Sequence, residues 1–186
     1  MINFYKANPR VTGTACSFYL NTRDNVFFST MIKQDSWDDK RRIGSFAKNK
    51  DNPSKKVNVK FSPMEIAGII DALESNREFS GYHGSNQVVK FKFCPYMKNG
   101  DQIGFSYSVN KESKEDATDK TSFIIGFNFP EAKLLREHLT FLLHKYFEAD
   151  EQSSDYVAKQ AVKKETSTTP PSNEGSLEEE DDLDVW

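Results

Sequence analysis

The 186-residue sequence is poor in cysteine, and it has neither a signal-peptide pattern nor a long apolar run. Cys16 and Cys94 stand alone without a CxxC motif, which favours two reduced thiols over a disulfide framework. The N-terminus lacks a basic segment followed by an apolar core, and no apolar run is long enough to span a membrane. We therefore expect a soluble protein of the cytoplasm.

Motifs of catalysis and of metal binding are absent as well. The sequence has no HExxH, GxSxG, P-loop or GxGxxG pattern. Its three histidines, His83, His138 and His144, have no carboxylate or cysteine pair beside them at metal-ligand spacing. These absences favour a protein without enzymatic activity, cofactor or metal. The alternative is an enzyme whose site follows none of these motifs.

Positive and negative charges are separated along the chain. Residues 148–186 hold twelve acids and three bases, whereas residues 1–147 hold 16 acids and 22 bases. Residues 174–186 contain seven acids and no base. A cationic body with an anionic end predicts an anionic partner for the body.

The composition divides the chain into three parts. Residues 1–148 are the expected folded domain, which is long enough to bury a sizeable core. Residues 149–173 include a Ser/Thr/Pro-rich run with too little apolar surface to offset its ordering entropy, so we interpret them as a flexible linker. Residues 174–186 are the acidic tail, which we expect to be disordered.

Two segments carry the pattern of an amphipathic helix with a capped start. Ser62, Pro63 and Glu65 supply a cap, a proline for the first turn and a capping-box glutamate. Asn128 and Glu131 repeat the cap and the glutamate 66 residues later. Apolar residues follow each start at helical spacing, so we predict two helices. These residues are Ile66, Ile69, Ile70 and Leu73 in the first, and Leu134, Leu135, Leu139, Leu142, Leu143 and Tyr146 in the second.

The common register of the two starts indicates an internal duplication. Phe61 matches Phe127, and Ile69 matches Leu135. The first half lacks a clear fourth strand. Strand-like runs precede the helices at residues 16–21, 26–32 and 56–61, with 44–47 as a further candidate, and at 88–94, 103–109 and 122–127. We predict an α+β domain of two antiparallel β-β-β(-β)-α repeats, about residues 10–80 and 86–148, related by a pseudo-twofold axis.

Basic residues interleaved with aromatic residues are the main functional signal. Residues 33–60 hold nine bases against four acids, and Trp37 lies among them. Because cations neutralise phosphates and exposed rings stack on bases, this mixture is typical of single-strand nucleic-acid binding. The candidate binding residues are Lys33, Trp37, Lys40, Arg41, Arg42, Lys48, Lys50, Lys55 and Lys56 in the first half, and Lys90, Lys92, Tyr96, Lys98, Tyr107 and Lys111 in the second.

The aromatic residues have two competing roles, core packing and stacking on bases. Alternation places one face of each strand in the core, so we assign Phe27, Phe91, Phe93, Phe123 and Phe127 to the core. Trp37 has no apolar periodicity around it, which favours an exposed ring. We expect Trp37, Tyr96 and Tyr107 to stack. The competing interpretation of the basic stretch is a solvated loop.

The acidic tail ends in a large aromatic residue, which suits a docking peptide better than a solubilising segment. The ring of Trp186 would fill a pocket of a partner protein while the carboxylates contact its basic rim. The acids also resemble phosphates and could occupy the body's own basic groove until nucleic acid displaces them. The partner-binding residues are Glu178, Glu179, Glu180, Asp181, Asp182, Leu183, Asp184, Val185 and Trp186.

These features resemble two known families. The tail is similar to the C-termini of bacterial and phage replicative single-stranded-DNA-binding proteins, a likeness that covers about the last ten residues. The doubled unit, with the helix-start segment VNVKFSPME at residues 57–65, resembles the Whirly and positive-cofactor type of transcriptional coactivator. That resemblance implies sheets that bind single strands through aromatic and basic residues, without enzyme activity.

Together the resemblances imply a phage or viral protein that binds single-stranded DNA independently of sequence, in the cytoplasm of a host cell. It would protect DNA in replication, recombination or repair and recruit partner proteins through its tail. Two alternatives stay open: an OB-fold body with the same function, and a transcription regulator or RNA-binding protein that uses the same sheet surface. The oligomeric state is open too, a homo-oligomer included.

Overall fold

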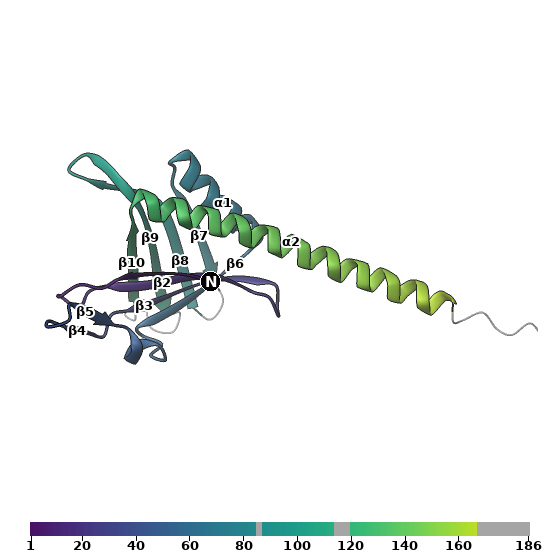
Figure 1. The fold of residues 1–186 in the computed structure, drawn as a ribbon, viewed down its shortest axis with the longest axis horizontal. Helices are drawn as coiled ribbons and strands as arrows, with labels where there is room; N and C mark the ends of the chain where they lie inside the picture. Colours follow the sequence, from purple (N-terminus) through teal and green to yellow (C-terminus); the bar gives the residue numbers. More distant parts are fainter. Residues whose placement is uncertain (85–86, 114–119, 167–186) are drawn as a thin grey trace, which may run out of the picture. The chain divides into compact units, whose positions relative to one another are not determined.

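Two four-stranded antiparallel sheets and two α-helices make up most of the described chain (Figure 1). The computed structural model describes residues 1–84, 87–113 and 120–166. One sheet, here called sheet A, has the strand order β1-β2-β3-β6, and the other, here called sheet C, has the order β10-β9-β8-β7. In Figure 1 the strands of sheet C stand upright and those of sheet A run across them.

Each half of the chain builds one sheet and then one helix, which confirms the predicted doubled α+β arrangement. This arrangement differs from an OB-fold, the alternative body, which has five strands and one interposed helix. The elements are β1 (Ile2–Lys6), β2 (Thr14–Asn21), β3 (Val26–Lys33), β6 (Lys56–Phe61) and α1 (Pro63–Ser75) in the first half, and β7 (Phe79–Gly84), β8 (Gln87–Lys98), β9 (Asp101–Ser113), β10 (Lys120–Phe127) and α2 (Phe129–Thr166) in the second.

The sequence patterns do not predict β1 and β7, which are edge strands of the two sheets. β1 pairs with β2 and supplies the fourth strand that the first half lacks in the sequence interpretation. β7 contains two glycines, and glycine is disfavoured inside strands. Gly81 lies opposite Phe91, and a Cβ at residue 81 would lie 2.3 Å from that ring. The close approach of this ring therefore favours glycine, and propensity alone does not show it.

Aromatic side chains fill the layer between the two sheets. The five phenylalanines assigned to the core are each at most 1% exposed, which confirms that assignment. Phe61 of sheet A meets Phe91 of sheet C edge-on, with ring centroids 4.9 Å apart. Phe4 and Phe127 make a similar contact at 4.8 Å. Burial of these large apolar surfaces is the main favourable contribution to folding.

Both helices begin at the predicted capping boxes. The Ser62 hydroxyl accepts a hydrogen bond from the Glu65 backbone N–H at 3.2 Å, and the Glu65 carboxylate accepts one from the Ser62 N–H at 2.8 Å. Asn128 and Glu131 make the same reciprocal pair at 2.9 Å in both directions. Each box satisfies backbone donors that the first turn of a helix otherwise leaves unpaired.

Each capping glutamate also ties its helix to the first strand of the other half. Glu65 Oε1 lies 2.7 Å from His83 Nε2 on β7, and Lys6 Nζ on β1 donates to Glu131 Oε2 at 2.7 Å. Burial opposes ionisation of Glu65, but hydrogen bonds from Ser62 and His83 outweigh it, so the pKa of this carboxyl is lowered. The duplicated cap therefore starts a helix and joins the two halves.

The helix α2 continues beyond the end of the domain that composition predicts. Residues 1–150 form one compact unit, and α2 continues beyond it through Thr166. Composition assigns residues 149–173 to a flexible linker. The described part of this range, residues 149–166, has a helical backbone, in line with its Ala, Glu, Gln and Lys content. Within the described residues, no helix combines the length and the apolarity needed to cross a bilayer.

Replacing Glu131 with alanine tests the double role of the capping glutamates. Glu131→Ala removes both the partner of the Asn128 N–H and that of Lys6, so we expect the free energy of unfolding to fall by about 1–2 kcal/mol. Urea unfolding followed by circular dichroism measures the change. Glu148→Ala, which alters an exposed ion pair on the same helix, is the control and should cost less than about 0.5 kcal/mol. Equal losses in the two variants would contradict the assignment.

Candidate nucleic-acid interface

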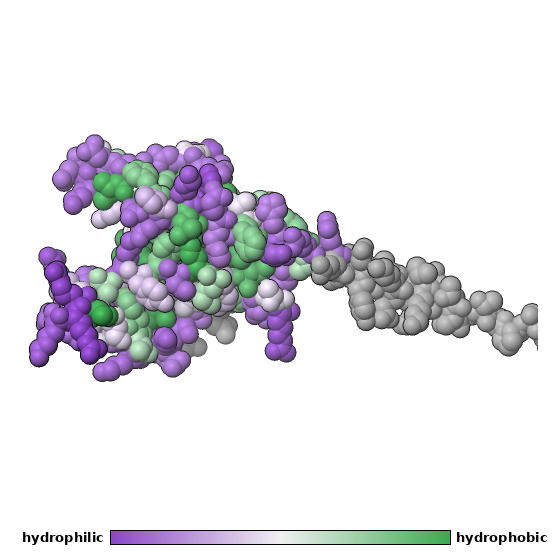
Figure 2. All heavy atoms as spheres, in the orientation of Figure 1, coloured by the Kyte–Doolittle hydropathy of each residue, from purple (hydrophilic) through white to green (hydrophobic). Residues whose placement is uncertain are grey.

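The basic stretch of residues 33–60 lies mostly in an insertion between β3 and β6. The insertion contains a hairpin of β4 (Ser36–Asp38) and β5 (Ile43–Ser45), followed by the 3₁₀ helix η1 (Ala47–Asn49). The strand predicted at residues 44–47 therefore belongs to this hairpin and not to sheet A. Figure 2 shows hydrophilic residues gathered over the hairpin, at the lower left of the view.

Gln34 holds the start of the insertion against the N-terminal segment. Its side chain is buried, and its amide makes four hydrogen bonds. Oε1 accepts from the backbone N–H of Asn8 and of Gly13, and Nε2 donates to the carbonyls of Asn8 and Ser36. A fully paired buried amide gives the insertion a defined starting geometry.

Asp35 holds the interior of the insertion together. Its carboxylate accepts hydrogen bonds from the Ser36 hydroxyl at 2.7 Å, the Ser45 hydroxyl at 3.2 Å and the Lys48 backbone N–H at 2.9 Å. The bond from Ser36 is the main reason why the pKa of this carboxyl is lowered. Because these bonds join β4, β5 and η1, the cations of the insertion are displayed on a fixed backbone.

Most candidate cations of the insertion are exposed on this backbone. Trp37 is half-buried in β4 opposite Gly44, and its stacking role stays a prediction. Arg42 has a positive φ of 55°, a backbone conformation common in tight turns. The exposed cations are Lys40, Arg41, Arg42, Lys48, Lys50 and Lys55, of which Arg41 lies 3.9 Å from Asp38.

Lys33 differs from these cations because it lies against the core. Its Nζ is 5.1 Å from the centre of the Phe123 ring, a cation–π contact. Burial and the nearby charge of Lys55 lower the pKa of its ammonium group. The structure therefore does not place Lys33 on the exposed surface with the other candidates.

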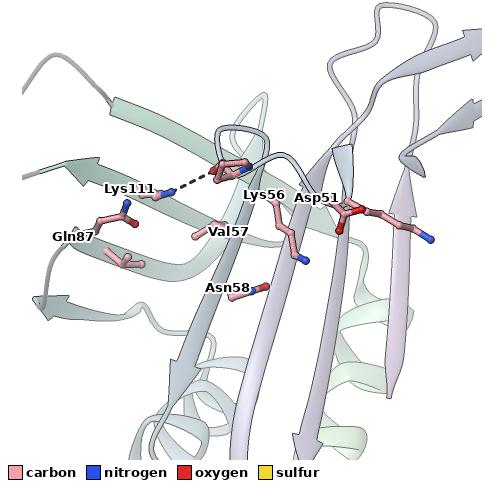
Figure 3. Close-up of a pocket in the computed structure, with 9 residues that line it drawn as sticks. Asp51, Lys56, Val57, Asn58, Gln87 and Lys111 are labelled. Atoms are coloured by element: carbon pink, nitrogen blue, oxygen red, sulfur yellow. Dashed lines mark hydrogen bonds between the residues drawn. The ribbon is translucent and has the colours of Figure 1, made fainter. Parts of the chain in front are cut away.

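Bases from both halves meet in a groove along β6, an edge strand of sheet A (Figure 3). Figure 3 shows Lys56 and Asn58 on β6 and Lys111 on the other side of the groove, where its Nζ donates to the Pro53 carbonyl at 3.2 Å. Among the described residues, no carboxylate lies within ion-pair distance of the groove lysines. The groove has a volume of about 450 Å³ and is lined by Lys50, Asp51, Pro53, Lys56, Val57, Asn58, Gln87, Val89 and Lys111.

Two candidate lysines of sheet C, Lys90 and Lys92, have acidic neighbours. Lys92 Nζ lies 2.6 Å from Glu78, and this hydrogen bond raises the pKa of Lys92. Lys90 lies 3.9 Å from Glu112, which also contacts Lys120 at 3.5 Å. These carboxylates offset the positive charge that the sequence places on β8. The sequence does not show the pairing, because the partners come from other segments of the chain.

The two tyrosines expected to stack on bases differ in exposure. Tyr96 is 44% exposed near the β8–β9 turn, where Lys98 is exposed as well. The stacking prediction for Tyr107 is wrong, because its side chain is fully buried. The register of β9 places Tyr107 on the inner face, with its hydroxyl 2.6 Å from Ser29 Oγ and its ring stacked on Phe93. Burial raises its pKa well above the usual value for tyrosine.

Three aromatic residues on the outer face of sheet A are missed by the sequence interpretation. Tyr5 is 66% exposed. Tyr19 and Phe28 are half-buried and stack on each other, with ring centroids 5.6 Å apart and an interplanar angle of 21°. A sequence signal for them exists, because the pairs Phe18-Tyr19 and Phe27-Phe28 must place one ring on each face of a strand.

Two further expectations, the absence of a metal and the role of the acidic tail, stay predictions. The described residues contain no cluster of His, Cys, Asp and Glu that could hold a metal ion. The acidic tail, with its candidate partner-binding residues 178–186, lies outside the described residues, so its role stays a prediction.

Tyr107→Phe tests the core role of the Tyr107 hydroxyl. The change leaves the buried Ser29 hydroxyl without its partner, so we expect a loss of about 1–2 kcal/mol in the free energy of unfolding. Affinity for an oligonucleotide should not change. Tyr82→Phe, at an exposed tyrosine of sheet C, is the control for the stability measurement. Unchanged stability in Tyr107→Phe would contradict the core role of the Tyr107–Ser29 contact.

Solved structures of plant proteins share this fold. WHY1 from Arabidopsis thaliana matches with a TM-score of 0.55 and 13% identity over 87% of this chain and 92% of that chain. The plant transcriptional regulator PBF-2 matches with a TM-score of 0.56 and 12% identity over 83% and 86% of the two chains. WHY3 from Arabidopsis thaliana matches with a TM-score of 0.56 and 12% identity over 86% and 95%. No protein-family model and no curated protein sequence matches this chain. At this level of identity the likeness concerns the fold alone, and the fold of this chain is Whirly-like.

Proposed function

We propose that this protein binds single-stranded DNA independently of base sequence and protects it in replication, recombination or repair. The observation that carries the proposal is the groove along β6, where Lys50, Lys56 and Lys111 come together from both halves of the chain. Among the described residues these three lysines have no ion-pair partner, and such a cluster of cations is a suitable site for phosphates, since binding releases condensed counterions. The Whirly-like fold supports the proposal, because the resemblance to the Whirly family implies sheets that bind single strands through aromatic and basic residues.

The chemistry of the groove suits binding that ignores base identity. Lysine presents a point charge, and it lacks the planar fork with which arginine meets planar acceptors in two places. Contacts to phosphates position a strand, whereas contacts to base edges specify its sequence. Asn58 and Gln87 are the neutral polar side chains among the described lining residues. The proposed function is binding without enzymatic activity. We also propose that the protein acts in the cytoplasm.

The acidic tail completes the proposal. The carboxylates of residues 174–186 would compete with phosphates for the groove, since both are anions that bind the same cations. Trp186 would anchor the tail in a pocket of a replication or repair protein. The resemblance of this tail to those of replicative single-stranded-DNA-binding proteins extends the proposal to a phage or viral origin.

A second candidate function is transcription regulation or RNA binding through the same surface. The observation that favours it is the structural likeness to PBF-2, which is named a plant transcriptional regulator. This function predicts a preference for RNA or duplex DNA over single-stranded DNA. Competition among the three nucleic acids for the protein separates the two candidates.

A salt titration of oligo-dT binding tests the proposed function. Fluorescence anisotropy should show an affinity that falls as salt rises, with a log–log slope of about −0.7 for each phosphate neutralised. Joint replacement of Lys50, Lys56 and Lys111 by glutamine should flatten the slope by about two units on this basis. Deletion of residues 174–186 should raise the affinity at low salt because a competing anion is removed.

Lys145→Gln is the matched control, since Lys145 is an exposed lysine of α2 that is paired with Glu148. It should leave the slope unchanged. If neither the full chain nor the chain without its tail binds oligo-dT at low salt, the proposed function is wrong.

A further inference from the structure

We infer that single-stranded nucleic acid binds on one sheet face only, the outer face of sheet A, and that the equivalent face of sheet C does not bind it. The inference rests on the proposed function and adds the surface, its residues and the side on which the phosphates lie. The outer faces of sheets A and C are equivalent by the duplication, so the side chains that they expose to solvent can be compared directly.

Strand register defines the outer face of sheet A. Inward residues such as Phe18, Phe27 and Val59 are buried, so their neighbours in sequence point outward. The strands of sheet A contain no Asp or Glu. Three rows cross the outer face: Tyr19, Phe28 and Lys60; Asn3, Ser17, Thr30 and Asn58; and Tyr5, Ala15, Ile32 and Lys56.

The aromatic residues of this face lie on β1, β2 and β3. Tyr19 and Phe28 form one stacked pair, and Tyr5 lies in a second row, with its ring centroid 5.9 Å from that of Phe46 in the insertion. Rings displayed on a sheet are stacking platforms for bases, and they tolerate any base because each base has a π-face. This side of sheet A therefore suits the bases of a strand.

The lysines of this face lie on β6, at the edge of the sheet. Lys56 and Lys60 point outward with Asn58 between them, about 13 Å apart along the strand. Neither lysine has a carboxylate within ion-pair distance among the described residues. Lys56 also lines the groove that holds Lys50 and Lys111, so the cations form a continuous track. Phosphates would follow β6 while bases extend over β3, β2 and β1.

The outer face of sheet C has similar residue types with a different charge balance. Tyr82, Lys90 and Asn110 form one row, and Lys92 lies in the next row with Ser80, Ser108 and Ile124. Glu112 and Glu78 contact the two lysines, so a phosphate would have to displace carboxylates that are already in place. This face has a hollow of about 440 Å³ that is large enough for a ligand. Both described lysines that line it, Lys90 and Lys92, are paired with glutamates. Charge pairing therefore distinguishes the two faces.

Matched variants of the full chain test the inference by oligo-dT anisotropy. On sheet A, the double variant Tyr19→Leu/Phe28→Leu keeps apolar bulk and removes both rings, and it should bind about tenfold more weakly or worse. Lys60→Gln should flatten the salt slope by about 0.7. On sheet C, Tyr82→Leu and Lys120→Gln remove an exposed ring and a paired lysine, and each should leave affinity within about twofold. Thermal unfolding of each variant shows that it is folded.

Photocrosslinking of the unaltered protein gives a readout that does not depend on variants. An oligonucleotide with 5-iodouracil should crosslink to peptides that contain Tyr5, Tyr19 or Phe28, as mapped by mass spectrometry. Crosslinks at Tyr82, with or without the sheet A sites, would overturn the inference and leave the proposed function standing. Failure of the unaltered protein to bind oligo-dT would instead overturn the proposed function itself.

Discussion

The apolar layer between the two sheets is the constraint on which the rest of the structure depends. Phe18 and Tyr107 meet across this layer with ring centroids 5.6 Å apart, and the Tyr107 hydroxyl closes on Ser29 because a buried hydroxyl without a partner is unfavourable. The side chains on the inner face of each sheet are therefore used for packing. Since successive residues point to opposite faces, a ligand is left with the outer faces, the free strand edges and the loops. The groove along β6 and the outer face of sheet A are surfaces of this kind.

The two halves keep the same scaffold and differ where they meet solvent. Glu65 and Glu131 each cap a helix and reach the first strand of the other half, so the duplication extends to the contacts that join the repeats. The outer faces have diverged. The strands of sheet A carry no carboxylate, whereas Glu112 on β9 contacts Lys90 and Lys120 of sheet C. A duplicated fold thus offers two equivalent platforms, and local ion pairing decides which of them presents uncompensated charge.

The sequence predicts features that depend on near neighbours and fails where distant segments decide. Both helix starts are predicted correctly because a capping box lies within four consecutive residues. β7 is missed because Gly81 makes room for the Phe91 ring, a requirement that arises only once the strands pair. Alternation along β9 is recognised, but the choice of inner face is not, which misplaces Tyr107. The neutralisation of Lys92 by Glu78 joins residues 14 positions apart through the register of β7 and β8.

Positive charge is concentrated where the insertion joins β6, at Lys50, Lys55 and Lys56. Burial and the charge of Lys55 lower the pKa of Lys33, so the free protein holds that ammonium at some cost in free energy. A carboxylate would relieve such crowding, as Glu112 does for the lysines of sheet C. Under the proposed function, phosphates bound along β6 would offset this repulsion as well, so charge crowding that is unfavourable in the free protein would favour binding of a polyanion.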